Sequence, residues 1–214
     1  GGKIMKVIAF NGSPKKHGNT YHAIKIVAEQ LSQEGINVEI IHVGDKPIRG
    51  CLACYKCDQN KDEKCVIDDY VNVWIQKIKK SDGIILGSPV HFSGISGTLK
   101  CFLDRAFLVS SVNGNLFRHK VGSALVAVRR SGGVTAFNQL LQYLTYAEML
   151  IPSSNYWNAI HGMNPGEVLK DEEGVQIMRV LGQNIAWLLK LVKNGKDKTK
   201  KPVKEQKIFT NFIR

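Results

Sequence analysis

The sequence has no long apolar run, and this absence limits the kind of protein it can be. Nowhere in the 214 residues do eighteen apolar residues follow one another, which argues against a membrane-spanning helix. The first ten residues, GGKIMKVIAF, lack the charged region and apolar segment that are typical of a secretory signal. We therefore expect a cytoplasmic protein with no membrane association.

Cysteine is also scarce, and four of the five cysteines fall in one stretch, GCLACYKCDQNKDEKC, at positions 50–65. In a reducing compartment such a cluster is more often metal-binding or catalytic than disulfide-bonded, and the odd number would leave one thiol over. The fifth cysteine, Cys101, lies in an apolar helical pattern and is expected to be a small buried side chain.

The spacing of the four clustered cysteines is C-x2-C-x2-C-x7-C. Three thiolates on one tight loop can ligate three irons of a 4Fe-4S cluster, and a fourth thiolate can ligate the remaining iron. Zinc sites more often show two separated C-x2-C hooks or histidine partners, and no histidine lies between residues 43 and 91. The spacing favours a 4Fe-4S cluster, with zinc, a redox thiol pair and structural thiols as alternatives. The expected ligands are Cys51, Cys54, Cys57 and Cys65.

Acidic residues are outnumbered, with 18 Asp and Glu against 30 Lys and Arg, for a formal net charge of +12. Half of this excess lies in residues 190–207, where eight lysines face two acidic residues. No aromatic residue interleaves with these lysines, as base stacking would require, so nucleic acid is an unlikely partner. We expect residues 194–214 to form a basic, solvated C-terminal tail.

The hydrophobic pattern alternates short β-branched runs with longer amphipathic stretches, which predicts strands separated by helices. Buried strands in βα alternation are typical of a doubly wound parallel sheet with helices on both faces. Residues 5–193 are therefore predicted to form one α/β domain. The predicted strands are 6–10, 38–43, 83–86, 123–128 and 155–160, and the predicted helices are 20–33, 69–79, 98–108, 135–149 and 174–192.

The turn after the first predicted strand has the composition of a phosphate-binding loop. The stretch NGSPKKHGNT at positions 11–20 combines glycines, hydroxyls and amides at the start of a helix, where unpaired N–H groups and the helix dipole favour an anion. It lacks both G-x-G-x-x-G and the G-K-[ST] ending of a nucleoside triphosphate loop. The alternative is a simple helix cap by Asn19 or Thr20 that binds nothing.

Two further loops leave predicted strands at the same edge. They are GSPVHFSGISGTLKCFLDR at 87–105 and VRRSGGVTAF at 128–137. Loops at the carboxyl ends of neighbouring parallel strands converge, so the three loops can surround one ligand.

Together, these three loops resemble those of the flavodoxin-like NADPH-dependent FMN reductase family, and the cysteine stretch resembles that of its iron-sulfur flavoprotein branch. The resemblance covers about residues 5–160, and the ending FTNFIR is also similar to that branch. It implies a five-stranded parallel sheet of order 2-1-3-4-5, a cysteine-rich insertion at 50–68 after the second strand, and a homodimer or homotetramer.

The resemblance also implies where FMN would bind. Its phosphate would lie against the first loop and its isoalloxazine ring against the second, with the third loop closing the other side. Arg129 and Arg130 are either a solvated pair or lie near the flavin or an NADPH phosphate. The implied FMN contacts are Ser13, Lys15, Asn19 and Thr20 for the phosphate, and Pro89, Val90, His91, Phe92, Ser131, Gly132 and Gly133 for the ring.

The predicted function is that of an FMN-dependent electron-transfer oxidoreductase that passes electrons between a 4Fe-4S cluster and FMN, with NAD(P)H or a ferredoxin-type protein as donor. One alternative is an FMN-only NAD(P)H-dependent reductase of quinones, flavin or nitro compounds with structural cysteines. A more distant one is a metal-knuckle module that binds nucleic acid or an acidic partner.

Overall fold

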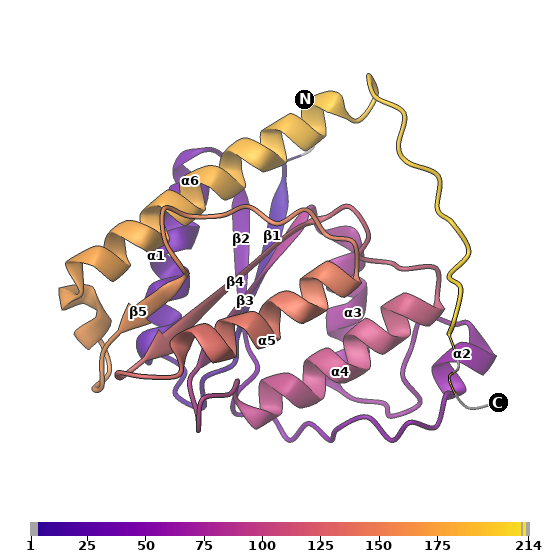
Figure 1. Ribbon diagram of the computed structural model, residues 1–214, viewed down its shortest axis with the longest axis horizontal. Helices are drawn as coiled ribbons and strands as arrows, with labels where there is room; N and C mark the ends of the chain where they lie inside the picture. The colour runs from indigo at the N-terminus through magenta and orange to yellow at the C-terminus, as the bar shows by residue number, and fades with distance from the viewer. Residues whose placement is uncertain (1–3, 211, 213–214) are drawn as a thin grey trace.

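The computed structural model describes residues 4–210 and 212, and they form a parallel sheet flanked by helices (Figure 1). The sheet has five strands in the order β2-β1-β3-β4-β5, and every neighbouring pair is parallel. This order confirms the flavodoxin-like prediction. The strands are β1 (Lys6–Asn11), β2 (Asn37–His42), β3 (Gly83–Pro89), β4 (Val121–Val128) and β5 (Ala159–His161).

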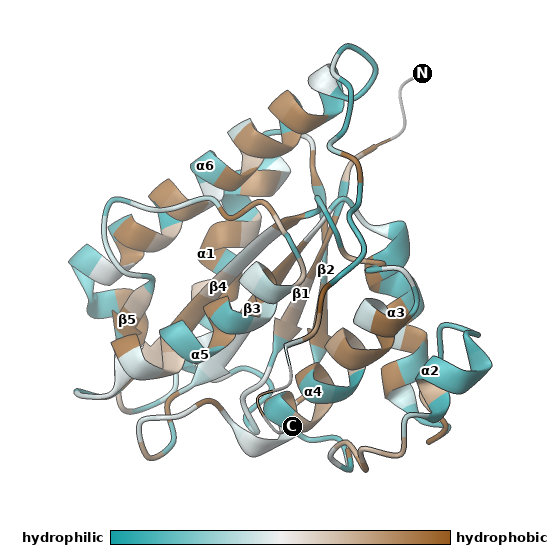
Figure 2. Cartoon of the chain, turned by 45° about the vertical axis from the view of Figure 1, so that its right-hand side comes forward, coloured by the Kyte–Doolittle hydropathy of each residue, from teal (hydrophilic) through white to brown (hydrophobic). Residues whose placement is uncertain are grey.

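Helices cover both faces of the sheet and create two apolar cores. Figure 1 shows α1 and α6 together on one face and α3, α4 and α5 on the other. Strand residues alternate between the cores, since Val7 and Ala9 pack toward α1 and α6 while Ile8 and Phe10 pack toward α3 and α4. In Figure 2 the strands show brown segments among paler ones, and β1, β3 and β4 are buried along most of their length. The long helices are α1 (Asn19–Gln33), α3 (Tyr70–Lys80), α4 (Gly97–Val112), α5 (Gly133–Tyr146) and α6 (Glu172–Gly195).

Two short elements and one strand differ from the sequence prediction. Helix α2 (Lys56–Asn60) and the 3-10 helix η1 (Glu167–Lys170) were not predicted, because a single turn is too short to show a helical period. The fifth strand was predicted at 155–160 but spans only Ala159–His161, which pair with residues 126–128. Residues 155–158 instead form the bend that leads into it.

The C-terminal residues leave α6 and run back along the α4–α5 side (Figure 1). Beyond α6, residues 196–210 and 212 are exposed, and they belong to no helix or strand. Arg118 Nη1 donates a hydrogen bond to the carbonyl of Pro202 at 3.3 Å, and Lys207 Nζ lies 4.0 Å from the centre of the Tyr146 ring. Three residues of the FTNFIR ending, Asn211, Ile213 and Arg214, lie outside the described residues. No described helix is both long and apolar enough to span a bilayer.

Candidate functional site

The loop between β1 and α1 is held in shape by its own side chains. Asn11, buried at the end of β1, accepts a hydrogen bond from the backbone N–H of Ser13 at 3.1 Å and donates one to the carbonyl of Lys16 at 3.1 Å. Ser13 Oγ in turn accepts from the N–H of Lys15 at 3.1 Å. The loop therefore has a fixed conformation before any ligand binds, which lowers the entropy cost of binding.

The N-terminus of α1 keeps free donors, contrary to the helix-cap alternative. The capping position is Gly18, and no side chain in the described part of the chain accepts a hydrogen bond there. Thr20 is 1% exposed, and its Oγ1 has no hydrogen-bond partner among the described residues. Asn19 does not cap the helix either, because its Oδ1 accepts from the N–H of Gly166 at 2.8 Å. A buried, unpartnered hydroxyl beside open helix N–H groups fits an anionic group such as a phosphate.

The four predicted phosphate residues and three of the seven predicted ring residues meet in one cleft of about 210 Å³ at the carboxyl edge of the sheet. Its walls come from the first loop, the end of β3, the end of β4 and the loop after β5. Of the predicted FMN contacts, seven line it: Ser13, Lys15, Asn19, Thr20, Pro89, Val90 and His91.

The remaining four predicted contacts lie outside the lining of this cleft. Phe92 is fully exposed at the tip of a tight turn, in which Phe92 and Ser93 both have left-handed backbone (φ 49° and 60°) and His91 and Gly94 exchange backbone hydrogen bonds. Gly132 packs on this turn so closely that a Cβ would lie 2.7 Å from Ser93 Oγ. Gly132 and Gly133 border a neighbouring hollow, and Ser131 is exposed. Their contact with FMN stays a prediction.

A third wall of the cleft was missed by the sequence reasoning. Gly162, Met163 and Pro165 line the cleft from the loop after β5, whereas Arg129, already named from the sequence as a candidate flavin neighbour, lines it from the end of β4. The bond from Gly166 N–H to Asn19 ties this loop to α1. The stretch GMNPG, directly after the last strand, carried the signal, since it leaves the sheet at the same edge as the other loops.

The four clustered cysteines line one small hollow of about 20 Å³ beside α4. Cys57 is buried on α2 and Cys65 is partly buried, whereas Cys51 and Cys54 are exposed. Burial raises the pKa of the Cys57 thiol, and the nearby thiols of Cys65 and Cys51 add to this effect. Within the part of the chain that the structure describes, no three potential ligands are already drawn together closely enough to hold a metal ion. The donor set nevertheless fits an iron-sulfur cluster, since it consists of four thiols that face one apolar hollow.

The exposed half of the cysteine loop is tightly coiled. Ala53 and Tyr55, which flank Cys54, both have left-handed backbone, with φ of 49° and 53°. Non-glycine residues adopt this conformation at a cost, and such residues are enriched at functional sites. The fifth cysteine, Cys101, is half-buried rather than fully buried as predicted, and it lies beside Gly50, where a Cβ would lie 3.6 Å from its Sγ.

Helix α4 reaches both candidate sites. Just before its first turn, Ser96 Oγ donates to the carbonyl of Gly12 in the first loop at 2.7 Å. Three turns later, Arg105, Leu108 and Val109 form the wall of the cysteine hollow. At 1.5 Å per residue, Ser96 and Arg105 are about 14 Å apart along the axis. The cleft and the hollow are therefore separate sites, and α4 joins the hollow to the first loop of the cleft.

Comparison with known proteins gives the class first. The sheet order and the position of the cleft define a flavodoxin-like protein. The solved structure of RosB with a bound 8-demethyl-8-formylriboflavin-5'-phosphate shares this fold, with a TM-score of 0.72. The two chains are 17% identical, and the match covers 99% of this chain and 94% of the RosB chain.

The family follows from the sequence. The profile of the NADPH-dependent FMN reductase family matches residues 5–164. An iron-sulfur flavoprotein of Methanocaldococcus jannaschii is 35% identical over 88% of this chain and 100% of its own length, and one of Methanosarcina thermophila is 29% identical over 91% and 100%. The chain belongs to the NADPH-dependent FMN reductase family, close to relatives named iron-sulfur flavoproteins, and is a flavin-dependent oxidoreductase.

Proposed function

We propose that this oxidoreductase carries both FMN and a 4Fe-4S cluster and passes electrons between them. The observation that carries the proposal is that all four cysteines of the C-x2-C-x2-C-x7-C motif line one hollow, although two of them are exposed and two are not. The names of the curated relatives support it. FMN exchanges one or two electrons and a 4Fe-4S cluster exchanges one, so the pair would link two-electron and one-electron donors.

On the flavin side, the chain would hold the phosphate at the start of α1. Thr20 Oγ1, Ser13 and Asn19 provide polar groups there, and Lys15 provides the charge. Pro89, Val90 and His91 would form the wall for the isoalloxazine ring, with the turn at Phe92 and the loop of Ser131, Gly132 and Gly133 closing over it. A rigid wall with few side-chain charges suits a flat aromatic ring.

On the cysteine side, the two halves of the ligand set would play different parts. Cys57 and Cys65 are anchored by burial and by hydrogen bonds of the adjoining backbone, so they would fix the position of the cluster. The exposed segment with Cys51 and Cys54 would then close over it. Closure would remove the thiols from water, which disfavours the thiolate form unless a bound metal compensates for the negative charge. Closure of the segment and binding of the cluster would therefore be coupled.

The electron donor in this proposal is NAD(P)H or a ferredoxin-type protein, and the assembly is a cytoplasmic homodimer or homotetramer. The domain of residues 5–193 would hold both cofactors, and the basic tail of residues 194–214 would remain outside them. Steady-state kinetics tests the electron donor, and sedimentation tests the assembly.

The test is an absorption spectrum, with iron and acid-labile sulfide analysis, of protein purified without oxygen. We expect flavin bands, a broad shoulder near 400 nm and about four irons per chain. Cys54→Ser should lose most of the iron and keep the flavin, whereas Cys101→Ser, which changes the one cysteine outside the hollow, should keep both. Flavin without iron in the wild-type protein would leave an FMN-only reductase.

A further inference from the structure

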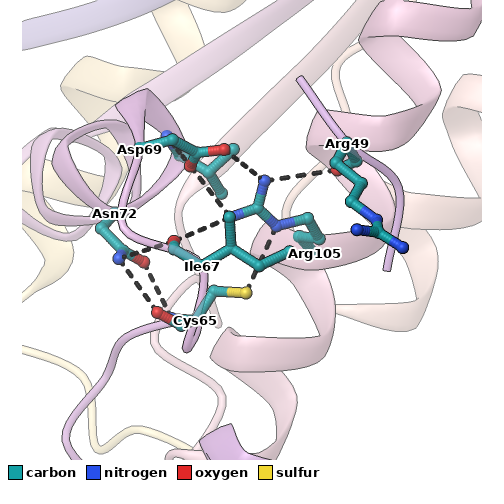
Figure 3. A network of polar contacts seen from close by, with 7 residues as sticks. Arg49, Cys65, Ile67, Asp69, Asn72 and Arg105 are labelled. Carbon is teal, nitrogen blue, oxygen red and sulfur yellow. Dashed lines mark hydrogen bonds and ion pairs between the residues drawn. The ribbon is translucent and has the colours of Figure 1, made fainter. Parts of the chain in front are cut away.

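Arg105 is a buried charge close to the cysteine hollow that the flavin cleft does not use. Its side chain is 0% exposed, and it is the only charged residue among the largest fully buried side chains of the described chain. It projects from α4 between the segments on either side of the cysteine loop (Figure 3). A charge in this position needs a partner at every donor, because burial without hydrogen bonds is costly.

Each of the five N–H bonds of this guanidinium has an acceptor. Two go to the carboxylate of Asp69, at 2.6 and 2.9 Å, in a bidentate ion pair. Two go to the backbone carbonyls of Arg49 and Ile67, at 3.3 and 3.0 Å. The fifth, from Nε, goes to Cys65 Sγ at 3.3 Å. A lysine could not make these five hydrogen bonds, since its side chain carries a single nitrogen with three N–H donors.

The hydrogen bonds of Arg105 attach both ends of the cysteine segment, residues 49–67, to α4. Arg49 lies two residues before Cys51, and Ile67 lies two residues after Cys65. Asn72 holds the backbone of the same segment with three more hydrogen bonds. Its Oδ1 accepts from the N–H of Cys65 at 2.8 Å, and its Nδ2 donates to the carbonyls of Cys65 and Ile67 at 3.0 and 3.2 Å (Figure 3). The position of Cys65 Sγ is therefore fixed by neighbours that do not themselves ligate metal.

From this network we infer that Arg105 is a positioning residue that holds the sulfur of Cys65 and raises the reduction potential of the cluster. The inference rests on the proposed function. Reduction adds one negative charge to a cluster, and a hydrogen bond to a ligating sulfur together with a nearby fixed positive charge stabilises that added charge. Asp69 opposes the effect, because its carboxylate neutralises much of the charge of Arg105.

Two substitutions should therefore move the potential in opposite directions. Arg105→Met removes the Nε–H donor and the positive charge, so the cluster should become harder to reduce. Asp69→Asn removes the negative charge that opposes Arg105, so the cluster should become easier to reduce. The asparagine keeps an oxygen that can accept the hydrogen bond from the N–H of Val71, which caps α3. The double variant leaves no unpaired charge and tests whether loss of the Nε–H donor alone lowers the potential.

The measurement is the midpoint potential of the cluster in the anaerobic holoprotein, followed by the electron paramagnetic resonance signal of the reduced state, with iron content determined for every variant. Arg118→Met is the control, because Arg118 is also ion-paired, to Glu148 at 2.5 Å, but does not border the cysteine hollow. It should leave the potential at the wild-type value.

Opposite shifts in the two single variants at full iron content would support the inference. The inference would be overturned if both single variants kept the wild-type potential, shifted it in the same direction, or lost their iron. The Arg105–Asp69 ion pair would then serve only to stabilise the fold. A wild-type protein that binds no iron would instead refute the proposed function, so the two failures can be told apart.

Discussion

Thr20 has a hydroxyl group that folding removes from water without giving it a partner among the described residues. A phosphate at the start of α1 would supply the missing acceptor, and a hydrogen bond to a charged group contributes about 1.5–3 kcal/mol. We expect Thr20→Val, which keeps the shape of the side chain, to weaken FMN binding by about 10- to 100-fold. The stability of the apoprotein should not fall, because no hydrogen bond is lost. Quenching of flavin fluorescence on titration into apoprotein measures the affinity.

Ser123 provides the matched control for this substitution. It is the other buried hydroxyl without a partner among the described residues, but it lies within β4 and does not line the cleft. Ser123→Ala should therefore leave FMN affinity unchanged. Equal affinity in Thr20→Val and wild type would show that the hydroxyl does not contact the phosphate.

Single residues also show how far the site was predictable from sequence. Ser13, Asn19 and Thr20 were predicted to form one phosphate-binding loop because hydroxyl and amide groups at the start of a helix favour an anion, and the structure brings them into one cleft. Arg105 was not singled out, since an arginine in an amphipathic helix usually faces solvent. Its burial depends on Asp69, 36 residues away in the sequence, and no local pattern reveals that pairing.

At the scale of elements, the first loop is shaped by the chain that leaves β2. Gly44 passes so close to it that a Cβ would lie 2.1 Å from the carbonyl oxygen of Ser13. We expect Gly44→Ala to destabilise the fold by about 1–3 kcal/mol, as overpacking does, and to weaken FMN binding because the Ser13 backbone must move. Gly97→Ala, which meets nothing within 4 Å, should do neither. Urea unfolding and flavin titration measure both effects, and an unchanged affinity in Gly44→Ala would contradict the coupling.

Glu39 links three elements, and this link should depend on pH. From β2, its carboxylate accepts from Lys6 of β1, with the two groups 2.7 Å apart, and from Lys77 of α3. These hydrogen bonds lower the pKa of Glu39. Because the folded pKa lies below the unfolded one, the stabilisation is present above about pH 4.5 and is lost as the pH falls through the folded pKa. Glu39→Gln should cost about 0.5–1 kcal/mol at pH 7 and much less at pH 3.

Urea unfolding at the two pH values tests this link, with Glu205→Gln as the control. Glu205 is exposed in the tail, so its substitution should not change stability at either pH. A cost of Glu39→Gln that is the same at pH 3 as at pH 7 would show that the ion pairs do not stabilise the fold.

The elements were predictable to the extent that they repeat a period over several residues. The first four strands and the five long helices lie where the pattern placed them, because each buries a continuous apolar face. The fifth strand has three residues and the helix inside the cysteine loop has five, which is too few to establish a period. Their positions depend instead on tertiary pairing with β4 and on the left-handed turn at Tyr55.

At the scale of the whole molecule, positive charge is concentrated in the C-terminal segment, since residues 190–207 hold eight lysines and two acidic residues. The chain has a net charge of +12, and the exposed residues beyond α6 include Lys198, Lys200 and Lys204. Such a segment attracts an acidic partner over a distance of about one Debye length, roughly 8–10 Å at physiological salt. We therefore hypothesise that the tail speeds the encounter with an acidic, ferredoxin-type electron carrier.

Replacing Lys198, Lys200 and Lys204 by serine should lower the second-order rate of reduction by such a carrier about 3- to 10-fold at low ionic strength, because steering acts on the association step. The difference should vanish at high salt, where screening removes the attraction in the wild-type protein as well. Reduction of an uncharged quinone by the same variant serves as the control and should keep its rate, since the cleft is unchanged. Stopped-flow measurement over a salt series decides the matter: a variant with the wild-type rate and the wild-type salt dependence would mean that the lysines take no part in the encounter.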